Sequence, residues 1–418
     1  MRLYRDWLLS LTAVRIRIDY FYAGVKGVMD QKFIENVKLV NDNLDTHFKR
    51  LIAQRKIRSA AYCIAKNGSI ISCHAMGAMD LGNGMERGID TDTIFEIQSV
   101  TKWITAAAIL ILQERGELSL ADRAGHYIEE LSETPFSEIT VLHLLTHTSG
   151  LVPLEGTFPD RDLHWQAYVD ERDVAGSWIP AVLKMGLSHR PGSRWEYSMV
   201  GFCLLGEIIA RITGEQAEDF IRREILLPCG MRETHWKREI TPEWVKRYQV
   251  RTERHRQQYA SAQDQGERAW IDYCAGWREI PETAGGLMST LKDVIRFGNM
   301  LAEGGSCGGR QILQESSLLL FEKNQLEPGA RDFCWGHGGV PFVYGAGCAV
   351  YDPSYEQALR LGEHTMYHEG TGPCMLMVNR KEKLAAVWDA PLWTEREWYA
   401  EPVRDTANII WEDFITRK

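Results

Sequence analysis

The chain has 418 residues, a formal net charge of −9, and 44% hydrophobic and 25% charged residues. This is the composition of an ordinary soluble globular protein, and the length allows one large domain or two intimately packed ones. The acidic balance and the lack of a clustered basic run exclude nucleic acid as an expected partner, because phosphate binding needs clustered Lys and Arg. No apolar stretch approaches the length of a membrane span.

The nine cysteines are scattered, and none is spaced as Cys-x-x-Cys. This pattern predicts neither a zinc site nor a disulfide framework, and it favours a reduced, cytoplasmic location. At the N-terminus an apolar run over 7–14 follows Arg2 and Arg5, as in a secretion signal, but Arg15 interrupts the pattern and no small-residue cleavage site follows. We therefore expect no export. Residues 1–32 are expected to form a loosely attached N-terminal extension, with an upstream mis-start over residues 1–28 as the alternative.

The first convincing elements are a helix and a hairpin. Apolar residues recur at steps of three and four from 33 to 51, which predicts an amphipathic helix. Two strands follow at 60–65 and 70–74. They flank Asn67-Gly68, a dipeptide typical of a tight hairpin turn.

The middle of the chain is mainly helical in pattern. An extended run at 94–98 leads into a helix whose residues 103–112 are almost all apolar, as in a helix buried within a protein. Further helices are predicted at 140–145, 178–187, 201–213 and 215–227. From 234 to 279 the chain is polar and aromatic without regular periodicity, which indicates a surface excursion or a wall over a substrate cleft.

Strands return near the C-terminus. The pattern predicts a hairpin from 373–379 and 384–389, a neighbouring strand at 343–351 and a last helix at 403–416. Because strands occur at both ends of the chain, we expect an α+β fold. One antiparallel sheet would be built from both termini and flanked by helices, with an inserted, mainly helical subdomain.

The expected division follows from that pattern. Residues 33–95 and 284–418 would form the sheet subdomain, and residues 96–283 the helical subdomain that carries the nucleophile helix.

Ser99-x-x-Lys102 stands at the start of the buried helix. Residues i and i+3 face each other on a helix, so Lys102 can reach the Ser99 oxygen. A neighbouring base makes a serine hydroxyl an effective nucleophile, and free N–H groups at a helix N-terminus favour developing negative charge. A second Ser-x-x-Lys runs from Ser289 to Lys292; there we interpret Ser289 or Thr290 as a helix cap and Lys292 as solvent-facing.

Blocks of sequence surround Ser99-x-x-Lys102 in a fixed order, at 95–102, 113–122, 139–151, 191–202, 204–214 and 284–290. Together they resemble the serine β-lactamase and penicillin-binding-protein-like superfamily over roughly residues 35–415. That group includes class C β-lactamases, D-alanyl-D-alanine peptidases and family VIII carboxylesterases. The resemblance implies the β-lactamase-like fold and chemistry through an acyl-enzyme.

The resemblance also implies roles for three catalytic residues. Ser99 matches the family nucleophile, Lys102 its partner, and Tyr197 the tyrosine of the family's Tyr-x-Asn motif. The pKa of Tyr197 is expected to fall, because a cation such as Lys102 nearby favours the phenolate, which can act as a general base. A buried core tyrosine is the structural alternative.

A further segment, His368-Glu369-Gly370-Thr371, stands in the place of the family's Lys-Thr-Gly. By resemblance, the N–H groups of Thr371 and Ser99 would form the oxyanion hole, and such donors contribute about 3 to 4 kcal/mol each to acyl transfer. Gly370 would let substrate approach the backbone closely. A turn-forming glycine before a strand is the alternative.

Two departures from the family pattern bear on the substrate. Met199 replaces the family asparagine and cannot bond strongly to a substrate amide. His368 replaces a permanently charged lysine, so recognition of a carboxylate is weakened unless Glu369 or another acid keeps the imidazole protonated. Both changes count against β-lactam hydrolysis and favour esters.

His143 and His147 are four residues apart and could share a helix face, which is the geometry of a two-histidine metal site. No acidic residue stands between them as in His-Glu-x-x-His, so packing or backbone hydrogen bonds near the cleft are favoured and no metal is expected.

These observations predict a cofactor-independent serine hydrolase that forms an acyl-enzyme on Ser99, most simply a carboxylesterase acting on small esters. The alternatives in the same superfamily are a D-amino-acid peptidase or amidase, a β-lactamase and an acyltransferase. A catalytically silent ligand-binding or scaffold protein is the alternative of another class. The expected partner is a small ester or amide substrate; the sequence leaves the oligomeric state open.

Overall fold

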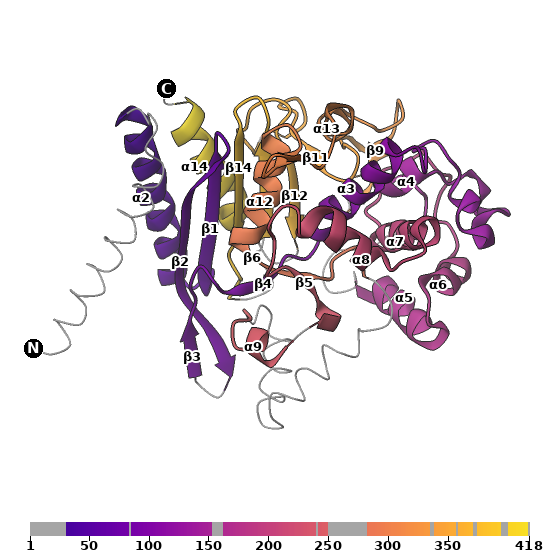
Figure 1. The fold of residues 1–418 in the computed structure, drawn as a ribbon, viewed down its shortest axis with the longest axis horizontal. Coiled ribbons are helices and arrows are strands. Elements are labelled where there is room, and N and C mark those ends of the chain that lie inside the picture. Colours follow the sequence, from indigo (N-terminus) through magenta and orange to yellow (C-terminus); the bar gives the residue numbers. More distant parts are fainter. Residues whose placement is uncertain are drawn as a thin grey trace, which may run out of the picture.

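The computed structural model describes residues 31–82, 85–152, 162–239, 241–249, 282–334, 338–356, 358–370, 374–393 and 400–416. At its centre lies a seven-stranded sheet with the order β11-β12-β13-β14-β1-β2-β3 (Figure 1). Its neighbouring strands pair antiparallel. Strands from the two ends of the chain meet where β14 pairs with β1. The predicted α+β fold, with one sheet built from both termini, is confirmed.

The seven strands are β1 (Ser59–Lys66), β2 (Ser69–Gly82), β3 (Met85–Gly88), β11 (Ala349–Val350), β12 (Met366–Gly370), β13 (Cys374–Asn379) and β14 (Leu384–Asp389). The turn between β1 and β2 has φ values of +51° at Asn67 and +79° at Gly68, as the predicted tight hairpin requires. The second predicted hairpin, β13–β14, is also confirmed. The strand expected at 343–351 is much shorter, because only Ala349 and Val350 pair with β12.

Helices cover both faces of the sheet (Figure 1). On one face lie α2 (Gln31–Ala53) and the C-terminal helical segment, made of η7 (Ala400–Asp405), α14 (Thr406–Trp411) and η8 (Glu412–Thr416). On the other lies α12 (Leu291–Ala302). Alternate residues of β1 therefore enter different cores: Tyr62 packs with α2, whereas Cys63 packs with the α12 side.

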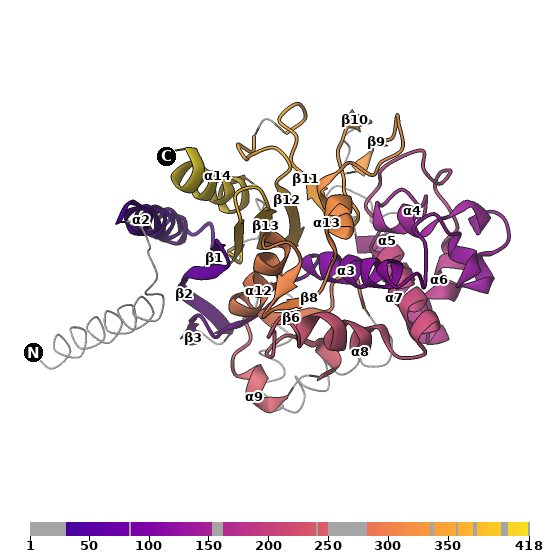
Figure 2. The ribbon, with the colours of Figure 1, turned by 45° about the horizontal axis from the view of Figure 1, so that its top comes forward.

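The second core continues into the helical part of the protein, around α3 (Val100–Glu114). Every residue of α3 from Val100 to Leu112 is buried, as its apolar sequence predicts. Figure 2 shows α3 running from the sheet toward the neighbouring helices. These helices are α4 (Val141–Leu145), α5 (Asp162–Ala175), α6 (Trp178–Met185), α7 (Met199–Thr213), α8 (Ala217–Ile221) and η4 (Arg222–Leu226).

The remaining elements are short connections. A three-stranded sheet has the order β4-β6-β5. Its strands are β4 (Ile94–Glu96), β5 (His235–Trp236) and β6 (Leu287–Thr290). The others are η1 (Ala124–His126), η2 (Glu129–Leu131), η3 (Phe136–Glu138), η5 (Lys237–Glu239), α9 (Pro242–Val245), β7 (Ser306–Cys307), β8 (Arg310–Gln311), α13 (Glu315–Glu322), β9 (Arg331–Asp332) and β10 (Val340–Pro341). The helix α13 was not predicted from the sequence.

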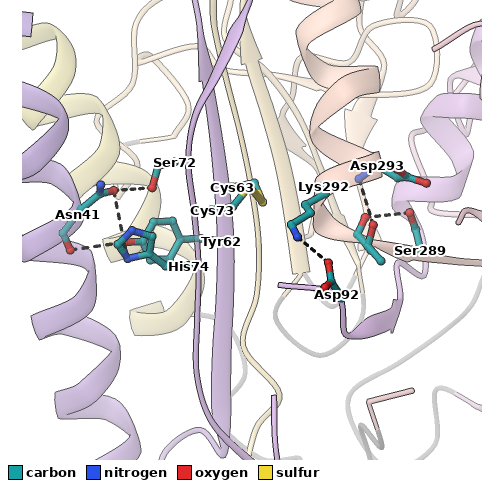
Figure 3. Close-up of a disulfide and its surroundings, with 11 residues drawn as sticks. Asn41, Tyr62, Cys63, Ser72, Cys73, His74, Asp92, Ser289, Lys292 and Asp293 are labelled. Atoms are coloured by element: carbon teal, nitrogen blue, oxygen red, sulfur yellow. Dashed lines mark hydrogen bonds and ion pairs between the residues drawn. A yellow bond between two sulfur atoms is a disulfide. The ribbon is translucent and has the colours of Figure 1, made fainter. Parts of the chain in front are cut away.

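One expectation about the cysteines is wrong. Cys63 and Cys73 form a disulfide between β1 and β2 (Figure 3). They stand directly opposite each other in the antiparallel register, which brings together two residues that are ten apart in the sequence. Cysteine spacing alone gave no sign of this pairing, because the hairpin register creates it. The cytoplasmic location inferred from cysteine usage stays a prediction, and this disulfide counts against it.

Some expectations concern parts of the chain outside the described residues. The proposed N-terminal extension falls almost wholly in 1–30, and much of the polar, aromatic excursion falls in 250–281. The division into a sheet subdomain and a helical subdomain also stays a prediction. Within the described ranges, no helix is both long enough and apolar enough to cross a bilayer.

Candidate active site

The predicted nucleophile lies at a sharp strand-to-helix turn. β4 ends at Glu96, Gln98 adopts a left-handed conformation with φ of +48°, and Ser99 is the N-cap of α3. A positive φ at a residue other than glycine is uncommon and requires support from the surrounding structure. In the described part of the chain the Ser99 N–H donates to no other group, so it can stabilise an oxyanion.

Part of the support for this turn comes from β12. A Cβ on Gly370 would lie 2.8 Å from the Ile97 carbonyl oxygen and 3.2 Å from Gln98 Cβ. Any larger residue would push β12 away from the nucleophile turn. Gly370 was expected to give room to the substrate; the close approach that the structure shows is to the protein's own backbone.

Lys102 lies one helical turn after Ser99 and is completely buried. Its Nζ donates to Ser99 Oγ over 3.1 Å and to the Ala284 carbonyl oxygen over 2.7 Å. Burial lowers the pKa of Lys102 to about 7, although the nearby Cys203 and Glu282 raise it in part. A large fraction of Lys102 is therefore a neutral amine at neutral pH, which is the form that can accept a proton from serine.

Tyr197 contacts both Ser99 and Lys102. Its hydroxyl is hydrogen-bonded to Ser99, and Lys102 Nζ lies 4.8 Å from the centroid of its ring. Burial raises the pKa of Tyr197, and the hydrogen bond to Ser99 lowers it by less. The expected lowering of the Tyr197 pKa is therefore wrong: at neutral pH the phenol keeps its proton, and Lys102 is the group with a perturbed pKa near 7.

The ring of His147 packs against this tyrosine, and the residue was not identified as a site residue from the sequence. Its ring centroid lies 4.3 Å from that of Tyr197, and its Nδ1 accepts a hydrogen bond of 3.1 Å from the Ser198 N–H. Burial and the nearby Lys102 lower the pKa of His147, so the ring is neutral and carries its hydrogen on Nε2. The position of this histidine inside the family block at 139–151 is the signal that the sequence offered.

His368 lies on β12 and is 5% exposed. Its Nδ1 donates to the Glu369 carbonyl oxygen over 2.8 Å. Burial and the nearby Lys102 lower the pKa of His368 to about 3, so the imidazole is neutral and presents Nε2 as an acceptor. Glu369 thus does not keep the ring charged, and the fixed cation of the family's Lys-Thr-Gly has no equivalent at this position.

The other predicted residues have different outcomes. Met199 is the first residue of α7, and its Cε lies 3.7 Å from the point where a Cβ of Gly285 would be. Thr371, the second expected oxyanion donor, lies outside the described residues. Its role stays a prediction.

The two histidines considered for a metal make other interactions. His143 caps α4 together with Thr140, and its Nε2 lies 3.1 Å from Glu327 Oε1. His147 accepts a hydrogen bond from the Ser198 N–H and packs against the Tyr197 ring, as described above. Among the residues that the structure describes, no group of three or more His, Cys, Asp or Glu side chains is arranged to hold a metal ion.

The side chains of the second Ser-x-x-Lys contact other residues and not each other (Figure 3). Lys292 Nζ forms an ion pair of 2.5 Å with Asp92 Oδ1, and Ser289 Oγ is hydrogen-bonded to Thr234. Thr290 caps α12 by accepting from the Asp293 N–H. The interpretation of this motif as a helix start is confirmed.

A comparison with protein families agrees with this geometry, since the beta-lactamase family model matches residues 44–398. The chain belongs to the beta-lactamase family. It is 28% identical to penicillin-binding protein 4* of Bacillus subtilis over 264 residues, which are 62% of this chain and 55% of that protein. It is 33% identical to esterase EstB of Burkholderia gladioli over 199 residues, 46% of this chain and 50% of that protein.

The chain thus aligns with about half the length of these two curated relatives. The fold is also that of a solved family VIII carboxylesterase, with a TM-score of 0.68 and 17% identity, covering 94% of this chain and 99% of that one. The resemblance inferred from the sequence blocks is confirmed at the level of family and fold. The protein is a member of the serine hydrolase superfamily, with esterases and penicillin-binding proteins among its relatives.

Proposed function

We propose that this beta-lactamase family member is a cofactor-independent serine hydrolase that forms an acyl-enzyme on Ser99 and acts as a carboxylesterase on small esters. The observation that carries the proposal is the distance of 3.1 Å between Ser99 Oγ and Lys102 Nζ, a buried amine with a pKa of about 7. A nucleophile next to a base poised near the working pH is the arrangement that acyl transfer needs.

In the acylation step, the neutral Lys102 amine accepts the Ser99 proton while Oγ attacks the ester carbonyl carbon. The carbonyl oxygen becomes an oxyanion beside the Ser99 N–H, with the Thr371 N–H as the proposed second donor. As the C–O bond to the alcohol breaks, the proton passes from Lys102 to the leaving oxygen. The protonated Tyr197 hydroxyl, hydrogen-bonded to Ser99, can relay it.

In the second step, water takes the place of the alcohol. Lys102, again neutral, accepts a proton from the water, which attacks the acyl carbon and displaces Ser99 Oγ. The serine recovers its proton from Lys102, and the carboxylic acid leaves. An alcohol or amine in place of water would give acyl transfer through the same residues, so acyltransferase activity remains the alternative in the same site.

The neutral imidazole at 368 supports esters over β-lactams. A β-lactam antibiotic carries a carboxylate that a fixed positive charge would bind, and His368 presents an uncharged acceptor instead. Met199 likewise offers no strong hydrogen bond to the amide of the acyl side chain.

We therefore expect short-chain p-nitrophenyl esters to be turned over at least about tenfold better, in kcat/KM, than nitrocefin or penicillin. A panel of these substrates, with D-amino-acid amides included, measures the preference directly. If nitrocefin were the better substrate, other residues would supply the missing contacts, and the esterase assignment would be wrong. If no substrate of the panel were turned over by correctly folded protein, the silent binding protein would be the better account.

The pH profile is expected to report Lys102. Only its neutral form accepts the Ser99 proton, so kcat/KM for a neutral ester should rise with pH to a plateau, with an apparent pKa near 7. The value belongs to the coupled group of Lys102, Ser99 and Tyr197. Stopped-flow or steady-state rates between about pH 5.5 and 9 would measure it. A midpoint near that of an ordinary tyrosine or lysine would contradict Lys102 as the base.

A further inference from the structure

A carboxyl group that the mechanism above does not use lies beside the nucleophile turn. Glu282 Oε1 is 3.1 Å from the point where a Cβ of Gly285 would stand. Met199 Cε lies 3.7 Å and the Gln98 carbonyl carbon 3.8 Å from the same point. That carbonyl carbon is bonded to the Ser99 nitrogen, so the Glu282 carboxyl and the peptide that carries the nucleophile border the same small space beside Gly285.

The absence of a side chain at Gly285 leaves space for this carboxyl. A side chain at 285 would occupy the space between Met199 and the nucleophile turn, and glycine leaves that space to Glu282. Glu282 is partly exposed, so a ligand can reach it. Met199 stands in the place of the family residue that contacts the amide of the acyl group. Since Met199 and Glu282 border the same space, the acyl part of a substrate would lie near Glu282.

Three cations and one further acid act on Glu282. They are Lys102 from α3, Lys237 from η5, Arg172 from α5 and Glu96 from β4. Burial raises the pKa of the Glu282 carboxyl, and the three cations lower it by less. A further cation bound beside it would favour the ionised form.

The cations near Glu282 have other acidic neighbours. Lys237 Nζ lies 3.6 Å from Glu96 Oε1, and Arg172 is paired with Asp173 at 2.5 Å. A large fraction of Lys102 is neutral at pH 7, as described above. Within the described residues no hydrogen bond or ion pair reaches the Glu282 carboxyl. The negative charge of an ionised Glu282 therefore has no direct partner among them.

We propose that Glu282 is a specificity-determining residue that binds a protonated amine on the acyl part of the substrate. The substrate class is then an ester of an amino acid or of a related aminoacyl group. An ammonium group placed beside the carboxyl would form a charge-assisted hydrogen bond, whereas a substrate carboxylate there would be repelled. This proposal rests on the proposed ester hydrolysis at Ser99.

The test uses two esters of equal size. The p-nitrophenyl esters of β-alanine and of butyrate have the same number of heavy atoms, and only the first carries an ammonium group. The quantity measured is the ratio of their kcat/KM values at pH 7, corrected for spontaneous hydrolysis. For the wild-type protein we expect a ratio of at least about ten, which decreases as NaCl is added because salt screens the charge pair.

Substitutions then assign the preference to one residue. Glu282→Gln should bring the ratio to about one, and Glu282→Lys should bring it below one, since like charges repel. Glu129→Gln, which removes an exposed carboxylate from η2, is the matched control and should keep the wild-type ratio. The ratio is insensitive to a partial loss of folded protein, because both esters report on the same active molecules.

The possible failures can be told apart. A wild-type ratio near one, or a ratio that is the same in wild type and Glu282→Gln, overturns the role of Glu282 while ester hydrolysis stands. If the wild type hydrolyses neither ester, or if Ser99→Ala hydrolyses both, the proposed function itself is overturned. The wild-type ratio and its salt dependence need no variant, so a ratio near one overturns the proposal even if a substitution prevents folding.

Discussion

Ser99→Ala and Lys102→Ala are each expected to lower kcat for a short-chain ester by at least about a thousandfold. The first substitution removes the attacking oxygen. The second removes the Lys102 amine, which lies 3.1 Å from that oxygen and is the only amine within hydrogen-bond distance of it among the described residues. Because both groups act in one step, the double variant should be little worse than either single variant. Steady-state rates for the three proteins measure both effects.

The second Ser-x-x-Lys provides a matched control for this result. Lys292→Ala removes a lysine from the same motif, but Lys292 is paired with Asp92 and its side chain is 37% exposed. We expect nearly unchanged kcat. If Lys102→Ala were as active as Lys292→Ala, Lys102 would not be the base.

Lys102→Met is expected to abolish activity and yet to stabilise the fold, by on the order of 3 kcal/mol at pH 7. The folded protein lowers the pKa of Lys102 from 10.5 to about 7, so the buried ammonium is unfavourable by about 1.4 kcal/mol per pKa unit. Loss of the hydrogen bonds to Ser99 and Ala284 offsets part of the gain. Methionine has a similar length and needs no partner in this position. Urea unfolding of both proteins measures the difference.

The pH dependence of that difference has a defined sign. Between pH 7 and 10.5 the unfolded wild-type chain binds a proton that the folded protein does not, so wild-type stability rises with pH in this window. The advantage of Lys102→Met should therefore shrink by about 1.4 kcal/mol per pH unit, and most clearly between pH 7 and 9. Lys292→Met, at an exposed ion pair, should show little change at either pH. An advantage of equal size at both pH values would contradict the lowered pKa of Lys102.

Local sequence patterns predicted the elements that local interactions determine. The spacing of apolar residues predicted α2, and the Asn67-Gly68 dipeptide predicted the turn between β1 and β2. The apolar sequence of α3 predicted a buried helix with Ser99 at its start. Each of these depends on contacts within a few residues, so a single chain segment contains the information.

Features that depend on distant contacts were not predicted. The Cys63–Cys73 disulfide requires the strand register, and the contact of Gly370 with Ile97 requires two segments far apart in the sequence to meet. The pKa of Tyr197 depends on burial, which outweighs its hydrogen bond to Ser99. No sequence motif pointed to Glu282. Its position near the nucleophile turn becomes visible only where the chain folds back at Gly285.

The central claim is that Ser99 is the nucleophile, and a serine-directed phosphonate tests it most directly. Intact mass should show a single addition, and peptide mapping should place it on Ser99, because this hydroxyl lies at a helix N-terminus beside the neutral amine of Lys102. Labelling should fail in Ser99→Ala and fall sharply in Lys102→Ala. Labelling at Ser289, or no labelling of correctly folded wild-type protein, would contradict the account.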